Sequence, residues 1–342
     1  MPERITILGD GAMATVCSIL LSEGGHAVTI WGAFEESIDR LRQNRENQRL
    51  LPGVRIPPRV RLTANESSCF DGCTLVVSAV PTQFMRQSWQ RLEKFFPKGT
   101  PIVSVAKGIE NGSLLRPTQV VTDVLGTRAQ ASSIAALSGP NIASELARYL
   151  PATAVVASLD EQLSRRVQEI FSTQWFRVYT NPDLIGTELA GATKNVIAIA
   201  AGILDGLAAG DNAKAALVTR GLVEITRLGV AMGAMEPTFQ GLAGQGDLIT
   251  TCFSPSSRNR TVGQQIGKGQ KLEDVLGGMS SVAEGVATTR SVRELSRRFH
   301  VEMPISDSVY AILFENKDVL SALSDLMMRE KKPESVSGRT PS

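Results

Sequence analysis

The chain has 342 residues, 42% of them hydrophobic and 20% charged, and 36 basic against 34 acidic residues give a formal net charge of +2. This is the composition of a globular protein long enough for two domains with separate cores. There is no block of like charge and no apolar run near the roughly 20 residues of a membrane-spanning helix, so we expect no nucleic-acid partner and no membrane partner.

Short β-rich runs alternate with helical patterns through the first half of the chain. The runs are ITILG (5–9), AVTIW (27–31), RVRLT (59–63), TLVVSAV (74–80), PIVSVAK (101–107), IAALSG (134–139), ATAVVAS (152–158) and FRVYTN (176–181). Several are apolar at nearly every position, as strands buried on both faces are. The pattern predicts an open parallel sheet of the doubly wound, Rossmann type in an α/β domain over residues 1–182.

The first strand leads into a glycine turn that reads Gly9-Asp10-Gly11-Ala12-Met13-Ala14 and opens a helical segment. In this context a Gly-x-Gly-x-x-Ala turn indicates dinucleotide binding. Gly9 permits the tight turn, Gly11 lets a pyrophosphate approach the helix N-terminus, and Ala14 keeps helix and strand close. A plain glycine turn is the alternative. Asp10 suits a pyrophosphate site only if its carboxylate points away.

The coenzyme stays open between NAD and NADP. An acid at the end of the second strand would bind the ribose hydroxyls of NAD. Here that strand ends in Trp31-Gly32-Ala33-Phe34, with Glu35 and Glu36 just after it. The immediate turn has no arginine for a 2′-phosphate, although Arg40 could reach from the next helical turn. The two nearby glutamates and the lack of an arginine in the turn slightly favour NAD.

The ends of two later strands also carry residues that are typical of ligand sites. Lys107 follows the strand 101–107, and ligands of such sheets bind just beyond the carboxyl ends of the strands. The alternative is a surface lysine in a loop. Gly139-Pro140 precedes a short helical pattern, and a proline suits a first helical turn whose free N–H groups can hold an anion.

The β pattern stops near residue 183, and an all-helical domain is predicted over 183–329. Its first helix contains ELAGATKNVIAIAAGILDG, in which Lys194 projects among small residues. Small residues let a ligand come close, and burial would lower the pKa of this lysine toward the 7 to 8 that proton transfer needs. A lysine that snorkels from a buried helix is the alternative. The polar tail over 330–342 is predicted to be disordered.

The segment GLAGQGDLITTCFSPSSRNRTVG supplies partners for Lys194. Its glycines form a loop that delivers Asp247, which could orient the ammonium while raising its pKa. Ser256 or Ser257 would cap a helix whose first turn holds Arg258 and Asn259, a combination that suits a phosphate. A simple cap with solvated arginines is the alternative. Glu284 marks another helix start, where an acid is favoured by the helix dipole.

Cysteine and histidine usage limits the chemistry. The four cysteines form no Cys-x-x-Cys pair, so we expect them to be reduced and structural. The two histidines, His26 and His300, cannot form a histidine-rich metal site, so no metal is expected and acid–base chemistry falls to lysine, aspartate or glutamate. The N-terminus enters an apolar strand almost at once, so no signal peptide is expected. These features favour a cytoplasmic protein.

The motifs taken together resemble the NAD(P)-dependent glycerol-3-phosphate dehydrogenases of the bacterial type. The blocks that carry the resemblance are VPTQFMR, VAKGIE, LSGPNIA, ELAGATKNVIAIAAGILDGL, NAKAALVTRGLVEITRLGVAMG, GLAGQGDLITTC, SRNR and VAEGVATT, in the order of that family, over roughly residues 4 to 325. The resemblance implies hydride transfer between a nicotinamide coenzyme and dihydroxyacetone phosphate, glycerol 3-phosphate for phospholipid synthesis, and a homodimer.

It also implies roles for individual residues. Lys194 would be the general acid/base and Lys107 would contact both substrate and cofactor. The substrate would be held by Lys107, Gly139, Asn141, Lys194, Asp247, Ser257, Arg258 and Asn259. The cofactor would contact Gly9, Gly11, Ala12, Met13, Ala14, Lys107, Ala143, Arg258, Val282 and Glu284.

Some positions depart from the family pattern. Asn141 stands where the family has Ser or Thr, Asp10 where it has alanine, and Thr193 where it has an aliphatic residue. The family often has an arginine or histidine near Ala33 or Phe34, so coenzyme preference stays open. Because both lysines, Asp247 and the Ser-Arg-Asn run are intact, we expect activity. Two alternatives remain: a related two-domain dehydrogenase of a β-hydroxy acid or sugar phosphate, and a non-catalytic dinucleotide sensor.

Overall fold

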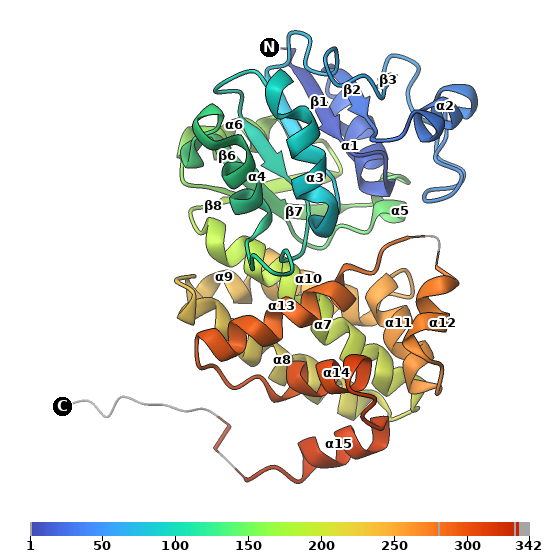
Figure 1. Ribbon diagram of the computed structural model, residues 1–342, viewed down its shortest axis with the longest axis vertical. Coiled ribbons are helices and arrows are strands. Elements are labelled where there is room, and N and C mark those ends of the chain that lie inside the picture. The colour runs from blue at the N-terminus through green and yellow to red at the C-terminus, as the bar shows by residue number, and fades with distance from the viewer. Residues whose placement is uncertain (1, 280, 332, 335–342) are drawn as a thin grey trace, which may run out of the picture.

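The computed structural model describes residues 2–279, 281–331 and 333–334. A lobe built on a sheet, here the sheet lobe, is followed along the chain by a lobe of helices, the helical lobe, and Figure 1 shows one above the other. The predicted fold class is confirmed. Most of the tail expected to be disordered, residue 332 and residues 335–342, lies outside the described residues.

An eight-stranded sheet with the order β3-β2-β1-β4-β5-β6-β7-β8 forms the core of the sheet lobe. The strands are β1 (Arg4–Leu8), β2 (Ala27–Trp31), β3 (Arg61–Thr63), β4 (Leu75–Ser78), β5 (Ile102–Ser104), β6 (Ile134–Ser138), β7 (Ala152–Ser158) and β8 (Phe176–Asn181). Each coincides or overlaps with a predicted run. The chain winds outward from β1 in both directions, as a doubly wound sheet does.

The prediction of a parallel sheet is wrong for its last two strands. Strand β7 runs antiparallel to β6, and β8 is parallel to β7. Between β6 and β7 the chain forms only the four-residue helix α5 (Ala143–Leu146). A parallel crossover usually contains a helix that runs back along the sheet, and a single helical turn is too short for this, so the chain turns back beside β6. Gly139 makes this return close: its φ is +128°, and a Cβ there would lie 3.1 Å from Ala154 Cα.

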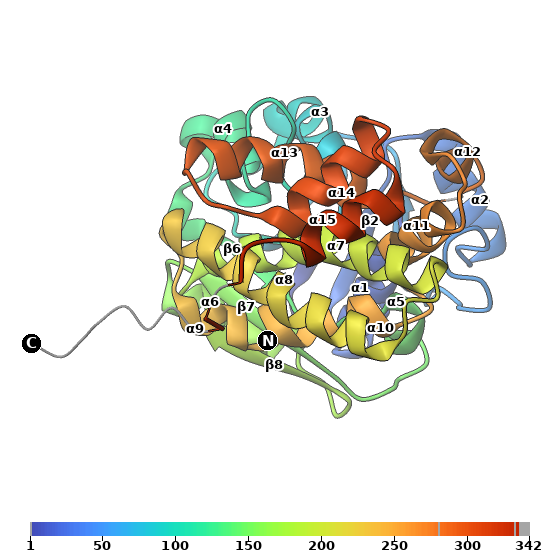
Figure 2. The same ribbon diagram turned by 90° about the horizontal axis from the view of Figure 1, so that it is seen from below.

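Helices cover both faces of the sheet. One apolar cluster joins the sheet to α1 (Ala12–Glu23) and α6 (Glu161–Phe171), and another joins it to α3 (Thr82–Leu92) and α4 (Pro117–Leu125). In Figure 2, α3 and α4 lie at the top of the view and α6 on its lower side. With both faces covered, the strands are apolar on both sides, which explains their continuous apolar runs.

Helix α7 (Leu184–Gly206) belongs to both lobes. Asp183 caps it by accepting a hydrogen bond from the backbone N–H of Gly186 at 2.8 Å. Its first residue, Leu184, packs with Ala136 and Ala157 of the sheet. The later turns are buried in the core of the helical lobe. The helix thus leads from the sheet directly to the second core.

The helical lobe surrounds α7 with shorter helices. They are α8 (Asp211–Ala231), α9 (Glu236–Gln240), α10 (Asp247–Phe253), α11 (Arg258–Gly267), α12 (Leu272–Gly277), α13 (Glu284–Arg298), α14 (Pro304–Phe314) and α15 (Val319–Met327). A Cβ at Gly202 would lie 2.0 Å from the carbonyl oxygen of Arg260, and one at Gly263 would lie 1.9 Å from that of Ile199. Many small residues of α7 therefore serve its close packing against α11. In the part of the chain that the structure describes, no helix is long and apolar enough to cross a membrane.

Candidate active site

The carboxyl ends of β4 and β5 face the helical lobe. The backbone N–H of Thr82, just after β4, donates to Glu284 Oε1 at the start of α13 at 2.7 Å. A Cβ at Gly108, just after β5, would lie 3.4 Å from Thr288 Oγ1 of the same helix. Ligands of doubly wound sheets bind at this edge. The candidate active site is therefore expected at the junction of the two lobes.

Two lysines from different lobes share one carboxylate at this junction. Lys194 Nζ lies 2.6 Å from Asp247 Oδ1, and Lys107 Nζ lies 2.7 Å from Asp247 Oδ2. Lys107 also donates to the carbonyl oxygen of Gly139 at 2.8 Å. Lys194 is 5% and Asp247 2% exposed, whereas Lys107 is half-buried. The structure thus brings together the two predicted lysines and the predicted aspartate.

The protonation of Lys194 is set by opposing effects. Burial lowers the pKa of its ammonium most strongly, the negative charge of Asp247 raises it, and the positive charge of Lys107 lowers it further. The result is a pKa of about 8, below the ordinary value of 10.5. An amine with this pKa can give or take a proton near neutral pH. The predicted lowering is confirmed.

The face of α7 near Lys194 is small because another side chain occupies it. A Cβ at Gly191 would lie 2.8 Å from Ser138 Oγ and 3.5 Å from Lys107 Cγ. The glycine therefore lets the stem of Lys107 and the end of β6 pack directly against α7. This close approach places the two ammonium groups on the same carboxylate.

Two polar residues of this site were missed by the sequence analysis. Thr251 Oγ1 accepts a hydrogen bond from Lys194 Nζ at 2.5 Å and donates to the carbonyl oxygen of Asp247 at 2.7 Å. Asn195 Nδ2 donates to the carbonyl oxygen of Lys107 at 3.1 Å. Thr251 follows Asp247 by four residues, so a helix predicted from Asp247 would have placed both on one face. The glycines before Asp247 predict a loop, but residues Leu242–Gly246 form a π-helical turn that continues into α10.

The start of α11 joins the site through an amide contact. Ser257 is its N-cap, and its hydroxyl accepts a hydrogen bond from the N–H of Arg260 at 3.3 Å. Asn259 Nδ2 donates to Asn195 Oδ1 at 2.9 Å, while its own Oδ1 accepts from the N–H of Gly285 at 2.9 Å. Asn259 is therefore locked beside the neighbour of Lys194, and one N–H of its amide remains for a ligand.

Arg258 lies at the rim of the same region. Its side chain is exposed, and its Nη1 donates to the carbonyl oxygen of Val282 at 2.9 Å. Val282 is 39% exposed, two residues before Glu284. Burial raises the pKa of the Glu284 carboxyl, against the N–H of Thr82 and the charge of Arg258, which lower it. The predicted helix start at Glu284 is confirmed.

The glycine turn lies at the same edge of the sheet. Gly9 has φ +112°, and a Cβ there would lie 2.8 Å from the carbonyl oxygen of Ala79 after β4, so no side chain fits. Gly11 is the N-cap of α1 without a side-chain cap, and nothing lies within 4 Å of where its Cβ would be. There is therefore open space beside Gly11 at the start of α1, which suits the approach of a pyrophosphate to the helix N-terminus. Asp10 turns its carboxylate away, since its Oδ2 accepts from Ser37 Oγ at 2.5 Å.

A small cavity of about 20 Å³ has Met13 of the glycine turn, Lys107 and Asn141 in its wall. Among the described residues, several buried side-chain oxygens near this junction have no hydrogen-bond partner. They are Thr82 Oγ1, Ser138 Oγ, Asn141 Oδ1 and Thr288 Oγ1. An unsatisfied buried polar atom costs about 1–3 kcal/mol, so the site holds hydrogen-bonding capacity that a polar ligand could use.

Helix α5 differs from the prediction. It begins at Ala143, so Pro140 precedes the helix and does not lie in its first turn. With only four residues, α5 is a poor anion site. Gly139 serves the site through its carbonyl oxygen, which accepts from Lys107, and Ala143 is half-buried beside the sheet.

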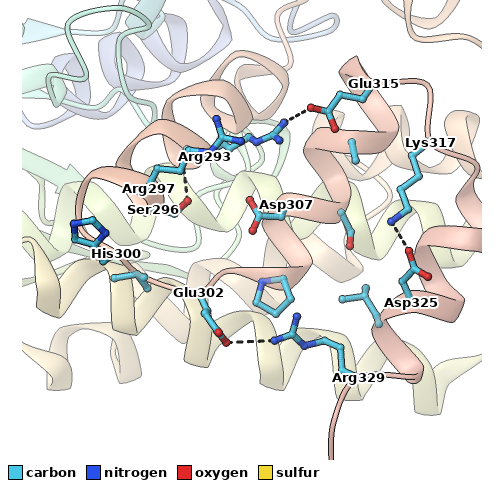
Figure 3. A pocket seen from close by; sticks show the side chains of 15 residues that line it. Arg293, Ser296, Arg297, His300, Glu302, Asp307, Glu315, Lys317, Asp325 and Arg329 are labelled. Atoms are coloured by element: carbon cyan, nitrogen blue, oxygen red, sulfur yellow. Dashed lines mark hydrogen bonds and ion pairs between the residues drawn. The ribbon is translucent and has the colours of Figure 1, made fainter.

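A larger cavity lies apart from this junction. It has about 710 Å³ and is lined by residues of α13, α14 and α15 (Figure 3). Its wall holds four arginines and lysines and four carboxylates, and Figure 3 shows ion pairs across it, including Arg293 with Glu315 and Lys317 with Asp325. No residue of the Lys194 site lines it, so we do not assign it to the reaction.

The four cysteines, Cys17, Cys69, Cys73 and Cys252, are free, as predicted. Burial raises the pKa of the Cys17, Cys69 and Cys252 thiols to about 12, so these are unreactive at neutral pH. Over the described ranges, no group of three or more His, Cys, Asp or Glu residues could hold a metal ion.

Comparison with known families matches nearly the whole chain. Residues 4–164 match the model of the N-terminal part of NAD-dependent glycerol-3-phosphate dehydrogenase, and residues 183–324 match that of its C-terminal part. The chain is 46% identical over 336 residues to the glycerol-3-phosphate dehydrogenase [NAD(P)+] of Citrifermentans bemidjiense, covering 98% of this chain and 100% of that protein. It is 47% identical over 330 residues to the enzyme of the same name from Prosthecochloris aestuarii, covering 96% and 99%.

Solved structures agree with this assignment. The crystal structure of glycerol-3-phosphate dehydrogenase from Coxiella burnetii superimposes with a TM-score of 0.91 at 35% identity, covering 96% of this chain and 99% of that one. A ketopantoate reductase from Ralstonia eutropha, at 14% identity and a TM-score of 0.57 over 95% and 99% of the two chains, shares the fold alone. The paired lysines at the lobe junction and these full-length matches lead to one conclusion: the chain belongs to the NAD-dependent glycerol-3-phosphate dehydrogenase family, oxidoreductases that use NAD or NADP and act on a CH–OH group.

Proposed function

We propose that this chain reversibly reduces dihydroxyacetone phosphate to sn-glycerol 3-phosphate at the junction of its two lobes. The observation that carries the proposal is the buried Lys194, whose pKa is about 8 and whose ammonium shares Asp247 with Lys107. Reduction of a ketone needs a proton donor at the carbonyl oxygen and positive charge close to it. The two lysines supply both.

The proton steps follow from this geometry. A bound reduced nicotinamide supplies a hydride to C2 of the substrate. As negative charge develops on the carbonyl oxygen, Lys194 donates a proton to it, and in the reverse direction Lys194 takes the proton from the hydroxyl group. Lys107 stabilises the developing oxyanion. Asp247 and Thr251 fix the direction of the Lys194 N–H bonds, so that one remains for the substrate.

The start of α11 is proposed to hold the phosphate group. Its N-terminal N–H groups and the exposed guanidinium of Arg258 favour a dianion. Asn259 and Ser257 complete this site, while Gly139 and Asn141 line the other side of the substrate. The unpaired Oδ1 of Asn141 supports a ligand there, because a substrate hydroxyl could donate to it.

The coenzyme is proposed to lie along the carboxyl edge of the sheet. The space beside Gly11 and the absence of a side-chain cap on α1 fit a pyrophosphate over Gly9, Gly11, Ala12, Met13 and Ala14. Toward the lysines it would contact Lys107, Ala143, Arg258, Val282 and Glu284. Glu284 accepts a hydrogen bond from the backbone N–H of Thr82, which keeps the turn after β4 in position.

We propose a dinucleotide-binding domain over 1–182 and a substrate domain over 183–329, since the last strand ends at Asn181 and α7 begins at Leu184. The family resemblance supports a homodimer and a role in phospholipid synthesis. Exposed apolar side chains on and after α15, with Met327 77% and Met328 82% exposed, support an oligomer. The free cysteines support a cytoplasmic location.

The function is tested with a Lys194→Ala variant and spectrophotometric oxidation of NADH and NADPH by dihydroxyacetone phosphate. We expect turnover to fall about 100-fold or more, the usual scale for lost acid–base catalysis, while coenzyme binding persists. Lys98→Ala removes an exposed lysine and serves as the matched control, with turnover unchanged.

Near-wild-type turnover in Lys194→Ala would rule out the proposed proton donor. Faster turnover of a β-hydroxy acid or another sugar phosphate in the same assay would favour a related dehydrogenase. Coenzyme binding without turnover of any substrate would indicate a sensor.

A further inference from the structure

Coenzyme selection in a doubly wound sheet takes place where the second strand ends. An acid there binds the ribose hydroxyls of NAD, and an arginine there accepts the 2′-phosphate of NADP. In this chain the end of β2 offers neither group. Trp31 is fully buried, Ala33 is apolar, and Phe34 is apolar and 72% exposed. Residue 32 is a glycine.

Asp10 occupies the space at that strand end. A Cβ on Gly32 would lie 3.2 Å from Asp10 Cβ and 2.7 Å from Ile38 Cδ1, so residue 32 cannot carry an acid of its own. Asp10 instead extends from the glycine turn toward helix α2 (Glu35–Asn44). Its Oδ2 accepts from Ser37 Oγ at 2.5 Å, and its carbonyl oxygen accepts from Asn47 Nδ2 at 2.9 Å. The carboxylate is therefore held in one orientation between the glycine turn and the end of β2.

The arginines around this point each face a carboxylate already. The pairs are Arg40–Glu36 at 2.6 Å, Arg42–Glu35 at 2.6 Å and Arg91–Glu66 at 2.8 Å. Arg91 also donates to the carbonyl oxygen of Ala33 and stacks over the Trp31 ring at 5.4 Å. Arg91 is thus held at the strand end by Glu66, by the carbonyl oxygen of Ala33 and by the Trp31 ring, and Asp10 is the carboxylate that the glycine turn places beside Gly32.

We propose that Asp10 selects the coenzyme: its carboxylate accepts a hydrogen bond from the adenosine 2′-hydroxyl of NAD and repels the 2′-phosphate of NADP. The inference rests on the proposed function and adds to it the class of dinucleotide, one without a 2′-phosphate. Asp10 Oδ2 accepts from Ser37 Oγ, and within the described residues its Oδ1 has no hydrogen-bond partner, so this oxygen can accept from a ribose hydroxyl. A 2′-phosphate would bring like charges together, which is unfavourable, whereas a hydroxyl gains a charge-assisted hydrogen bond.

The test is a fluorescence titration of the purified full chain with NADH and with NADPH, without substrate. We expect the native protein to bind NADH at least tenfold more tightly than NADPH. Asp10→Asn keeps the size of the side chain and an acceptor for Ser37 but removes the charge. It should bring the ratio of the two dissociation constants down about tenfold, mainly through tighter NADPH binding. Asp10→Ser is a second variant without the charge, in case Asp10→Asn does not fold. A thermal unfolding curve of each variant shows whether it is folded.

Asp71→Asn is the matched control. Its carboxylate is 66% exposed in the loop before β4, at the opposite edge of the sheet, and this variant should leave the ratio unchanged. Arg40→Ala tests the competing explanation, in which Arg40 leaves Glu36 to hold a 2′-phosphate, and it should also leave the ratio unchanged.

The inference is overturned if the native protein binds NADPH as tightly as NADH. It is equally overturned if both Asp10 variants keep the native ratio, or if Arg40→Ala selectively weakens NADPH. In each of these results coenzyme still binds, and the proposed function stands. Binding of neither coenzyme would refute the proposed function itself.

Discussion

Lys194 and Asp247 form the part of the site where a change of one group alters the chemistry most directly. Asp247 is the only carboxylate that the structure shows in an ion pair with Lys194 in the described chain, and it carries Lys107 as well. The negative charge of Asp247 favours the charged form of Lys194, while the burial of Lys194 and the positive charge of Lys107 oppose it. The pKa of about 8 is the balance of the two effects.

The pH dependence of turnover should reflect this balance. Reduction needs protonated Lys194, so its rate should fall as pH rises through about 8, and oxidation of glycerol 3-phosphate should rise over the same range. Asp247→Asn removes the charge that raises the pKa of Lys194 and leaves Lys107, which lowers it. The midpoint of the residual reduction activity should therefore move to lower pH.

The exposed carboxylate of Asp274 in α12 provides the control, since Asp274→Asn should keep the native midpoint. A midpoint in Asp247→Asn equal to or higher than the native value would contradict the assignment of the titrating group to Lys194.

At the scale of elements, the positions of the strands could be predicted from the sequence. Buried parallel strands are apolar throughout, and glycines often follow their ends. The run 27–31 coincides with β2 and 152–158 with β7. The antiparallel direction of β7 could not be predicted from the sequence, because it depends on α5 being a single turn. In the site, the lysines, Asp247 and the start of α11 could be predicted. The orientation of Asp10 could not, because it depends on Ser37 in a separate helix.

The start of α11 yields a prediction about substrate binding. Arg258→Ala should raise the Michaelis constant for dihydroxyacetone phosphate by at least tenfold with a smaller effect on turnover, because a charge-assisted contact to phosphate is lost. Steady-state kinetics measures both constants. Arg165→Ala on α6, an exposed arginine in a surface ion pair, should change neither. Equal losses of Arg258→Ala with an unphosphorylated analogue would argue against a phosphate contact.

The contact between α8 and α14 predicts a pH effect on stability. Glu224 is 3% exposed and accepts hydrogen bonds from the N–H groups of Ile305 and Ser306 at 2.8 and 3.3 Å, capping α14 from a neighbouring helix. Burial raises the pKa of Glu224 from 4.5 to about 7, against those hydrogen bonds. Between these pH values the folded state binds more protons than the unfolded state, so stability falls as pH rises.

Glu224→Gln stays neutral at every pH and removes this dependence. Urea unfolding at pH 5 and pH 8 should show the native protein losing up to about 3 kcal/mol relative to the variant over that interval. A constant difference between the two proteins would show that Glu224 is ionised in the fold across the whole range.

At the scale of the whole molecule, buried polar contacts join the lobes. Glu188 of α7 pairs with Arg116 and accepts from the N–H and hydroxyl of Thr118 at 2.8 and 2.7 Å, which ties the start of α4 to the helix that leads to the second lobe. Both charged side chains are at most 10% exposed. Breaking one half of a buried pair leaves the other charge without a partner.

Glu188→Ala should therefore lower the free energy of unfolding by about 3–5 kcal/mol. Chemical denaturation measures the loss, and Glu161→Ala, which breaks an exposed pair with Arg165 on α6, should cost far less. A Glu188→Ala variant as stable as Glu161→Ala would show that the lobes hold together without this contact.

The reversed direction of β7 and β8 has a mechanical consequence. The chain leaves β8 at the edge opposite the carboxyl ends of β1 and β4, so α7 must travel back over the sheet before Lys194 reaches the lysine–aspartate cluster. The continuous helix α7, capped by Asp183, is thereby anchored in the cores of both lobes, and the chain passes from one core to the other without a flexible linker. A change in the angle between the two lobes would therefore have to twist or bend α7, the helix that carries Lys194.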